Sequence, residues 1–167
     1  VEMALQYVRL ESETNDFVVE KVKLDGVIRG AIRKYARMFI HKKINLEYQG
    51  TELAALTDEK WLSFVVEQIL SNAVKYTAKG KITIRFEGEG TGTLFLVIAD
   101  TGIGIKAEDL PRICEKGYTG YNGHADKHST GIGLYLCNRI LKELGHSLTI
   151  TSKEGEGTRV SIGFAVK

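Results

Sequence analysis

The chain has 167 residues, of which 43% are hydrophobic and 26% charged, and its formal net charge is +2. This length suffices for one domain with a full core, and the weak charge argues against a dedicated nucleic-acid binder. No apolar run is long enough to span a membrane, and no signal peptide is recognisable. Two cysteines without metal-ligand spacing favour reduced thiols in the cytoplasm. Because the chain starts at Val1 rather than Met, we expect a fragment or processed form.

The first part of the chain predicts a helix end, a strand, a helix and a second strand. Residues 1–9 have helical spacing but are too few to be stable alone, so we interpret them as the end of a longer helix. The valine-rich stretch 17–24 predicts a strand. Asp25 is expected to cap the helix that follows, in which apolar residues recur at helical spacing up to Phe39. Alternation over residues 44–48 predicts a short strand.

A loop is expected next, and then Thr57 or Asp58 as the cap of a helix over residues 61–77, WLSFVVEQILSNAVKYT. At about 100° per residue, its apolar side chains fall on one broad arc. The opposite arc carries Glu67, Ser71, Lys75 and Asn72, in that order around the helix. An oxygen-rich face beside a lysine suits Mg²⁺ and phosphate. A simply solvated surface is the commoner explanation of a polar helix face.

The second half predicts two hairpins separated by a loop and a helix. The expected segments are a hairpin over 81–99 leading to Asp100, a short helical stretch over 107–113, a mobile loop over 114–130, a helix over 132–144, and strands over 147–152 and 158–165. Two hairpins indicate a mixed sheet. We therefore predict an α+β fold, a two-layer sandwich with the helices packed on one face of the sheet, and not a doubly wound dinucleotide fold.

Two glycine motifs follow elements that can position a ligand. Asp100-Thr-Gly102-Ile-Gly104-Ile comes directly after a buried strand, and Gly131-Ile-Gly133 opens a helix. An acid at a strand end can accept a hydrogen bond from the exocyclic amine of a base, and a glycine-rich helix start offers N–H groups to phosphates. A lone Gly-x-Gly is a weak signal. A P-loop is excluded, because the sequence has no G-x-x-x-x-G-K-[ST] motif.

Taken together, these motifs resemble the ATP-binding domain of bacterial sensor histidine kinases, in the GHKL ATPase superfamily. The segment from Glu67 to Thr77 resembles the N box, the Asp100 motif resembles the G1 box, and Ser129-Thr-Gly131-Ile-Gly133-Leu134 resembles the G2 box. Gly155-Glu-Gly157-Thr158 resembles the last glycine box. The boxes occur in family order across about residues 16–167. Further likeness, at Glu115–Gly120 and Ala4–Tyr7, is to small intramembrane-sensing kinases that respond to peptide antibiotics.

This resemblance implies a Bergerat-type ATP-binding fold with bound ATP and Mg²⁺. Asn72 would coordinate Mg²⁺, Glu67 would orient or polarise a Mg²⁺-bound or attacking water, and Lys75 would neutralise phosphate charge, so these three are the expected catalytic group. Asp100 would bind the adenine amine. The remaining expected nucleotide contacts are Tyr76 against adenine, Thr158 through water, Gly102, Ile103 and Gly104 at the pocket edge, Gly117 and Tyr118 in an ATP lid over 114–130, and Thr130, Gly131, Ile132, Gly133 and Leu134 around the phosphates.

Two features depart from the family pattern. Cys114 and Gly117 stand where the lid of many relatives has aromatic residues, so lid docking is expected to differ. The phospho-acceptor histidine, which is followed by an acid and then a proline, is missing. Pro111 is the single proline, and no such histidine precedes it. The chain's own histidines, His41, His124, His128 and His146, have no acceptor context and are interpreted as surface, loop or structural residues.

The predicted function is transfer of the γ-phosphoryl of Mg-ATP to a histidine on another segment. Residues 1–12 would be a remnant of the dimerisation helix and 16–167 the catalytic domain. The alternatives are an ATPase or nucleotide-gated switch on the same fold, and a degenerate interaction module. Expected partners are the dimerisation and phospho-acceptor domain and a response regulator, with no nucleic acid and no membrane contact by this segment. The full-length protein would be a homodimeric membrane protein with this domain in the cytoplasm.

Overall fold

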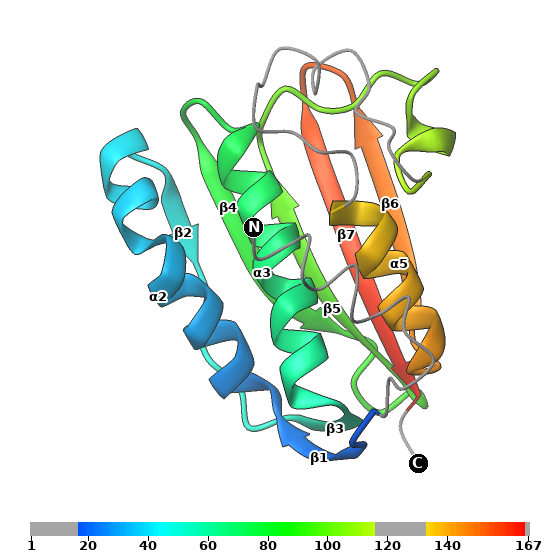
Figure 1. Cartoon of the computed structure of the whole chain (residues 1–167). Coiled ribbons are helices and arrows are strands. Elements are labelled where there is room, and N and C mark those ends of the chain that lie inside the picture. Colours follow the sequence, from blue (N-terminus) through cyan, green and yellow to red (C-terminus); the bar gives the residue numbers. More distant parts are fainter. Residues whose placement is uncertain (1–16, 116–132, 166–167) are drawn as a thin grey trace.

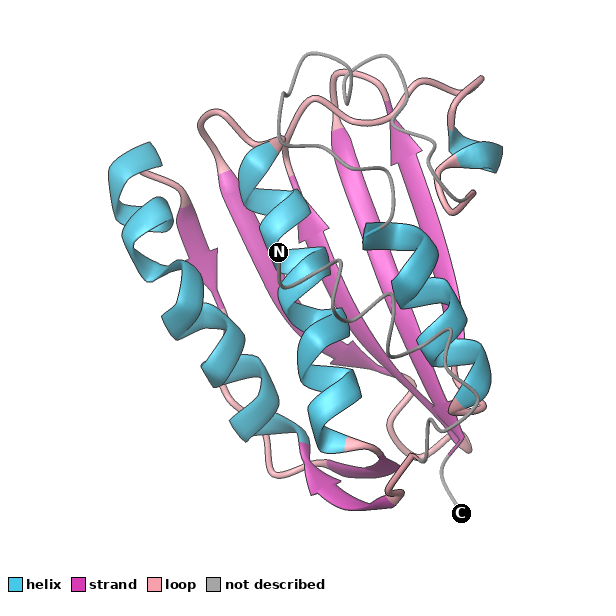
Figure 2. Ribbon diagram, in the orientation of Figure 1, coloured by secondary structure: helices cyan, strands magenta, loops and turns pink. Residues whose placement is uncertain are grey.

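The computed structural model describes residues 17–115 and 133–165. Three α-helices of this part lie side by side on one face of a five-stranded sheet (Figures 1 and 2). The helices are α2 (Leu24–Lys42), α3 (Glu59–Lys75) and α5 (Gly133–Glu143), with a short 3-10 helix, η1 (Leu110–Arg112). The strands are β1 (Glu20–Lys23), β2 (Asn45–Glu47), β3 (Ala54–Thr57), β4 (Lys81–Glu87), β5 (Thr93–Asp100), β6 (Ser147–Lys153) and β7 (Gly157–Ala165). No helix in the described ranges is long and apolar enough to cross a membrane.

The main sheet has the strand order β2-β4-β5-β7-β6, with β2 parallel to β4 and the other pairs antiparallel. Both predicted hairpins, β4–β5 and β6–β7, are therefore present, and β5 and β7 join them at the centre. A separate two-stranded sheet, β1 with β3, lies at the lower end of the molecule in Figure 1. The predicted α+β sandwich with helices on one face of a mixed sheet is confirmed.

The central helix α3 forms the middle of the core, between α2 and α5 (Figure 1). Every residue of its predicted apolar arc is buried: Leu62, Val65, Val66, Ile69, Leu70, Ala73 and Val74. Trp61, in the first turn of α3, is 6% exposed and contacts the rings of Phe17 and Phe64. Burying such side chains contributes about 1.5–3 kcal/mol each, so this arc fixes how α3 lies on the sheet.

The outer face of the sheet carries no helix in the described part of the chain, yet Val97 of β5 is fully buried there. The strand register places Val97 between Phe95, opposite Glu87, and Ala99, opposite Arg159. The Arg159–Glu87 ion pair (2.5 Å) therefore crosses β5 at the level of Val97, and Arg85 also binds Glu87 at 3.0 Å. Long arginine stems can shield apolar surface in this way. This arrangement explains the predicted apolar character of β5 on both faces.

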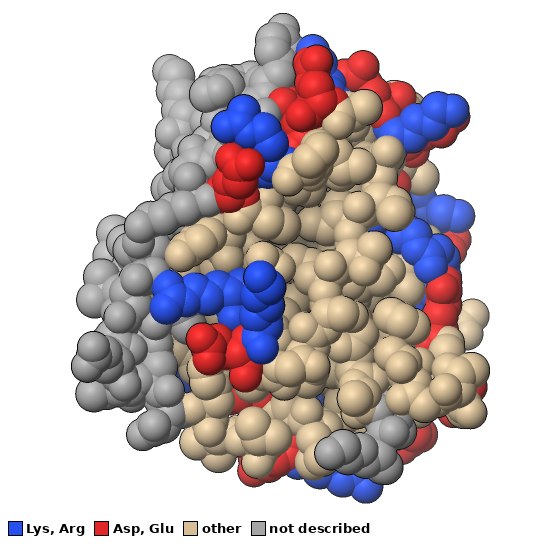
Figure 3. Space-filling view, turned by 90° about the vertical axis from the view of Figure 1, so that its right-hand side faces the viewer, with Lys and Arg blue, Asp and Glu red and all other residues tan. Residues whose placement is uncertain are grey.

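The edge strand β6 has no charged residue before Lys153. Viewed from that side of the molecule, a broad uncharged surface separates groups of charged residues (Figure 3). Inward-facing Leu148 and Ile150 alternate with exposed serine and threonine, as expected of a strand with one buried face.

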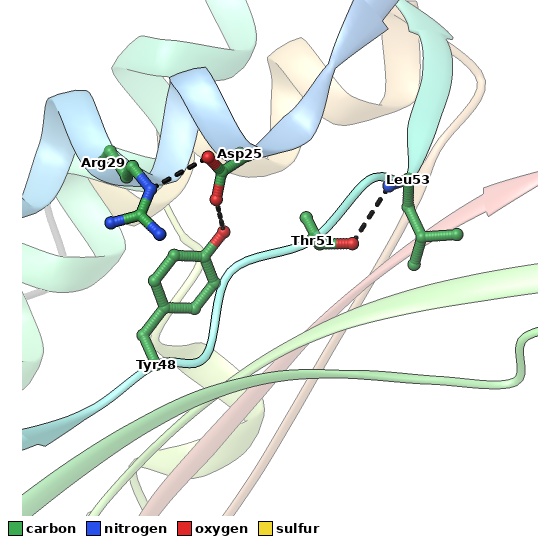
Figure 4. A network of polar contacts seen from close by, with 5 residues as sticks. All are labelled: Asp25, Arg29, Tyr48, Thr51 and Leu53. Carbon is green, nitrogen blue, oxygen red and sulfur yellow. Dashed lines mark hydrogen bonds and ion pairs between the residues drawn. The ribbon is translucent and has the colours of Figure 1, made fainter.

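Two predictions near the start of α2 were wrong. The strand predicted over 17–24 is shorter, since β1 covers Glu20–Lys23 and Leu24 already begins α2. Asp25 is not the N-cap: the cap position is Lys23, without a side-chain hydrogen bond. Instead, the Asp25 carboxylate accepts hydrogen bonds from Tyr48 Oη and from Arg29 Nε, at 2.8 Å in the latter (Figure 4). Asp25 thereby ties the first turn of α2 to the segment after β2, a long-range contact that no local pattern reveals.

The segment expected to be a loop before α3 contains a short strand, β3, paired with β1. Its sequence, Ala-Ala-Leu-Thr, does not alternate between apolar and polar residues, so it carries no strand pattern. Asp58, one of the two caps considered, is the N-cap, and its Oδ1 accepts from Trp61 N at 3.0 Å. Its Oδ2 accepts from Val18 N at 2.8 Å. Consequently α3 begins and ends two residues earlier than predicted.

His146 gives the fold a pH-dependent contact. Its Nε2 lies 2.9 Å from Thr57 Oγ1, its ring packs edge-on against Phe164, and burial lowers its pKa. The folded state therefore binds fewer protons than the unfolded state near pH 6. Stability from this group is complete above the unfolded pKa of about 6.5 and falls as the pH falls through it.

We expect the free energy of unfolding in urea to drop more between about pH 7.5 and about pH 5.5 in the parent than in His146→Gln, which cannot titrate in this range. His41→Gln, on the exposed side of α2, serves as the matched control and should behave as the parent. Equal pH slopes for the parent and His146→Gln would contradict this account.

Candidate functional site

Five segments meet at one end of the sandwich, the upper end in Figure 1. They are the carboxyl end of α3, the end of β5, the loop over residues 100–105, the β6–β7 turn and the first residues of α5. Four of them carry the motifs that the sequence singled out. The residues of the N, G1 and last glycine boxes are thus brought to one place, as predicted.

Asp100, the last residue of β5, organises this end of the molecule. Its Oδ1 accepts from the backbone N–H of Gly102 at 2.9 Å and from that of Thr158 at 3.3 Å. Its Oδ2 accepts no hydrogen bond from the described residues. Burial raises the pKa of Asp100, and the two N–H groups partly offset this effect. The half-buried carboxylate therefore keeps one acceptor oxygen available at a site where its charge is disfavoured.

The loop after Asp100 passes so close to its neighbours that glycine is required. A Cβ on Gly102 would lie 2.3 Å from the Tyr76 carbonyl oxygen, and one on Gly104 would lie 2.2 Å from the Lys153 carbonyl oxygen. Gly104 also has a φ of 73°, which favours glycine. From the other side, a Cβ on Gly157 would lie 2.0 Å from the carbonyl oxygen of Asp100.

Hydrogen bonds fix the loop in this narrow space. Ile103 donates its N–H to the Tyr76 carbonyl at 3.1 Å and accepts from Gly155 N at 2.7 Å. Ile105 N donates to Ser152 Oγ at 2.8 Å, and that oxygen is 2.8 Å from Thr158 Oγ1. Thr158 is thereby held beside Asp100. The loop is bound to α3 on one side and to the β6–β7 turn on the other, which leaves the Ile103 side chain 43% exposed.

Thr77 has an unpartnered hydroxyl at this site. Its side chain is fully buried, and Oγ1 is a buried side-chain oxygen that has no hydrogen-bond partner among residues 17–115 and 133–165. A Cβ on Gly102 would be 2.8 Å from this oxygen and 3.0 Å from Asp100 Oδ1, so the two oxygens flank Gly102. Leaving a buried hydroxyl unsatisfied costs about 1–3 kcal/mol. Thr77 is not among the predicted nucleotide contacts, and its place directly after Tyr76 in the N-box segment was the available signal.

The polar arc of α3 divides between two sides. Glu67 is on the α2 side, where its carboxylate forms an ion pair with Lys34 at 3.1 Å. Asn72 lies about 140° further around the helix at 100° per residue, beyond Lys75. The Lys75 ammonium lies 5.3 Å from the centre of the Tyr76 ring, and burial lowers the pKa of Lys75. Asn72, Lys75 and Tyr76 therefore share the end of α3 that faces the site, whereas Glu67 points elsewhere.

Gln68 is the half-buried residue that sequence reasoning missed on this face. It lies one turn before Asn72 and about 40° from it around the helix. Side chains four residues apart are neighbours on a helix surface. The i, i+4 spacing from Asn72 was therefore the signal that could have identified Gln68. The assignment of Glu67 to metal or water stays a prediction.

The expected lid and most of the G2 box lie outside the described residues. This holds for Gly117, Tyr118, Thr130, Gly131 and Ile132, and for His124 and His128. Gly133 and Leu134 open α5, both half-buried. Cys114 lies near the end of the first described range, at the start of the expected lid. Cys137 is fully buried in α5, where its Sγ faces the carbonyl of Val65.

A half-buried acid at a strand end, glycine-dependent close approaches and a polar helix end thus lie together at one end of a two-layer α+β domain whose sequence has no P-loop. Residues 57–167 match the family described as "Histidine kinase-, DNA gyrase B-, and HSP90-like ATPase". This chain belongs to that family.

Curated relatives agree with this assignment. "Sensor protein BceS" of Halalkalibacterium halodurans is 38% identical over 98% of this chain and 49% of its own length. "Sensor histidine kinase YxdK" of Bacillus subtilis is 35% identical over the whole chain and 52% of its own. "Sensor histidine kinase GraS" of Staphylococcus haemolyticus is 35% identical over 96% of the chain and 46% of its own. The chain thus spans about half the length of the curated relatives that it matches, and the resemblance to sensor kinases is confirmed.

Solved structures show the same fold. The structure titled "ShkA full-length in complex with AMPPNP" superposes with a TM-score of 0.79 at 21% identity, over 99% of this chain and 35% of that one. The mycobacterial sensor histidine kinase MprB has a TM-score of 0.75 at 23% identity, over 89% and 97%. The catalytic domain of histidine kinase ThkA has a TM-score of 0.73 at 20% identity, over 89% and 96%.

The close approach at Gly102 can be tested by adding one methyl group. Gly102→Ala places a Cβ against the Tyr76 carbonyl, so we expect a loss of about 1–3 kcal/mol in the free energy of unfolding in urea. Gly26→Ala is the matched control, because that helical glycine has nothing within 4 Å. The control should raise stability by about 0.5–1 kcal/mol. Equal responses of the two variants would contradict the packing described for the loop.

Proposed function

We propose that this chain binds Mg-ATP and passes the γ-phosphoryl to a histidine of a separate dimerisation domain in a sensor histidine kinase. The observation that carries the proposal is two incompletely bonded groups beside Gly102: Oγ1 of Thr77, which has no partner among the described residues, and the carboxylate of Asp100, whose Oδ1 lies there and whose Oδ2 accepts no hydrogen bond from those residues. A fold that leaves a hydroxyl and a carboxylate partly unsatisfied at one point is destabilised there unless a ligand completes them.

An adenine ring fits this donor and acceptor set. Its exocyclic amine would donate to Asp100 Oδ2, and Thr77 and Thr158 can each bind a water or a ring nitrogen. The approach of the loop over residues 100–105 to the end of α3 leaves a backbone edge suited to a flat ring. Tyr76 is the aromatic side chain next to this edge, in keeping with the role that the family resemblance implies for it.

The triphosphate and metal would lie toward Asn72 and Lys75. Among the described residues, no group of three or more His, Cys, Asp and Glu could hold a metal ion. Mg²⁺ usually keeps several waters and takes few protein ligands beside substrate phosphates, so the single amide oxygen of Asn72 is compatible with it. Lys75 supplies positive charge for the phosphates. Phosphoryl transfer needs mainly such positioning and charge neutralisation.

For the group that orients water next to the metal, we propose Gln68 beside or instead of Glu67. Gln68 shares the helix face of Asn72, whereas Glu67 is engaged with Lys34 on the α2 side. An amide can orient a water but is not a base. This favours orientation of Mg²⁺-bound water over activation of water for attack, which suits a transferase better than a hydrolase.

The partners follow from the same proposal. The acceptor histidine would belong to a dimerisation domain of the same kinase, and the phosphoryl group would pass on to a response regulator. Residues 1–12 would be the end of the dimerisation helix, although they lie outside the described residues. The relatives are named as sensor proteins or sensor kinases. As the family resemblance implies, the parent would be a homodimeric sensor kinase of the intramembrane-sensing, peptide-antibiotic-responsive kind, with this domain in the cytoplasm.

The second candidate is an ATPase or nucleotide-gated switch without phosphotransfer. The family description also covers DNA gyrase B and HSP90-like proteins, so the fold does not separate the two. The names of the curated relatives favour the kinase.

The adenine assignment predicts the behaviour of Asp100→Asn. The asparagine keeps the oxygen that accepts from Gly102 and Thr158 but replaces Oδ2 by a donor that faces the adenine amine. We expect ATP affinity, measured by calorimetric titration, to fall roughly tenfold or more. The melting temperature without nucleotide should not fall, because burial disfavours the charge that is removed.

Glu154→Gln, on the exposed β6–β7 turn, removes the same charge as a control. Unchanged ATP affinity in Asp100→Asn would exclude the assignment.

The transfer reaction predicts phosphorylation in trans. The described histidines lack an acceptor context: His41 is exposed on α2, and His146 is bonded to Thr57. In-line attack requires an acceptor held at the γ-phosphoryl, with ADP as the leaving group. The chain with γ-labelled ATP should label a separately supplied dimerisation domain from the parent protein, with an acid-labile bond, and should not label itself. Stable label on this chain, or hydrolysis unaffected by the added domain, would favour the second candidate.

A further inference from the structure

The carboxyl end of α3 is bonded by a lysine from another helix. The last four carbonyl groups of a helix have no partner within it. At this end, Lys42 of α2 donates from Nζ to the carbonyl oxygen of Val74 at 2.5 Å and to that of Lys75 at 3.3 Å. The next carbonyl, that of Tyr76, accepts from Ile103 N. Two separate segments, α2 and the loop over residues 100–105, therefore complete the end of the helix that carries the proposed nucleotide contacts.

The charge of Lys42 matters as well as its hydrogen bonds. A helix presents about half a negative elementary charge at its carboxyl end. In α3 this end lies beside Asn72 and Lys75, where the proposed function puts a triphosphate of high negative charge. An uncompensated helix end would repel that ligand. A half-buried ammonium on the last two carbonyls offsets the repulsion, and Val74, to which it donates, is fully buried, which limits screening of the contact by water.

We propose that Lys42 is a positioning residue for the nucleotide: its ammonium group holds the carboxyl end of α3 and offsets the negative end of the helix dipole beside the triphosphate. The identity of the ligand, Mg-ATP, rests on the proposed function. The contact of Lys42 with the carbonyl groups of Val74 and Lys75 does not. Lys42 acts through Lys75 and Tyr76. Its ammonium group binds the carbonyl of Lys75, and Ile103 N binds the next carbonyl, that of Tyr76.

The alternative is that Lys42 merely stabilises the packing of α2 on α3. A structural role would lower stability on substitution and would affect all ligands of the site alike. A charge that compensates the helix dipole affects an anionic ligand more than a neutral one. Adenosine and ATP share the base and sugar and differ in the triphosphate, so their affinities separate the two roles.

The test uses Lys42→Met, which keeps the length of the stem and removes both the donor and the charge, and Lys42→Arg, which restores them. Lys43→Met, at the adjacent exposed position, removes the same charge without these bonds. In Lys42→Met we expect affinity for Mg-ATP to fall by a factor of about 3 to 10, and affinity for adenosine to change by less than about twofold. Lys42→Arg should restore most of the ATP affinity, and Lys43→Met should resemble the parent.

A second measurement needs no nucleotide. The amide hydrogens of Tyr76, bonded to the Asn72 carbonyl, and of Ile103, bonded to the Tyr76 carbonyl, report on the end of α3. Their exchange with solvent should be at least about threefold faster in Lys42→Met than in the parent or Lys43→Met. This arm also decides the contact if Lys42→Met binds nucleotide too weakly for titration, because it needs no ligand.

Unchanged exchange at both amides would overturn the claim that Lys42 holds the helix end. Equal losses of affinity for ATP and adenosine would overturn the electrostatic part and leave a structural lysine. If the parent itself binds neither ligand, the proposed function fails, and the exchange measurements still decide whether Lys42 holds α3.

Discussion

The loop after Asp100 is held between α3 and the β6–β7 turn, and the arrangement of the site depends on this constraint. One carboxylate oxygen of Asp100 accepts the N–H of Gly102, two residues away, and the N–H of Thr158, 58 residues away in the sequence. At Gly102, Gly104 and Gly157 the backbone approaches neighbouring carbonyl groups to distances that a Cβ would forbid. Because Asp100 ends the central strand β5, the position of the loop is set by the sheet itself. The site is therefore rigid where it would meet a base.

The helix side of the site depends on two features of different origin. The apolar arc of α3 sets the rotation of the helix on the sheet, and this rotation directs Asn72 and Lys75 to the site and Glu67 toward α2. The position of the helix along its axis is fixed at both ends. Asp58 caps its first turn and also binds Val18 N, and Lys42 and Ile103 bind its last carbonyl groups. Rotation thus follows from hydrophobic burial, and axial position from polar contacts between distant segments.

This division explains what could be predicted from the sequence. The order of elements apart from β3, the two hairpins, the buried arc of α3 and the meeting of the N, G1 and last glycine boxes follow from local periodicity and motif order, and these are present in the described residues. The errors concern contacts across long sequence separation. Asp25 has the residue type of an N-cap but binds Tyr48 and Arg29, and β3 exists because β1 pairs with it. Glu67 and Gln68 are adjacent in sequence, and only the position of α2 beside α3 shows which of them is engaged elsewhere.

The site also carries local costs that the rest of the fold must offset. A hydroxyl without a partner at Thr77, and a carboxylate whose charge is disfavoured by burial at Asp100, each destabilise the chain without ligand. A lysine with a pKa lowered by burial, Lys75, adds a third group in an unfavourable environment. All three lie within one turn of the end of α3 or beside it.

Packing alone gives no reason to keep such groups together, since apolar residues of similar size would satisfy the fold better. A ligand with a hydrogen-bond donor at one end and negative charge at the other would relieve all three at once, and its binding would stabilise the domain by mass action. The energetic pattern of these three groups is thus consistent with the ligand class that the motifs and the family assignment suggest.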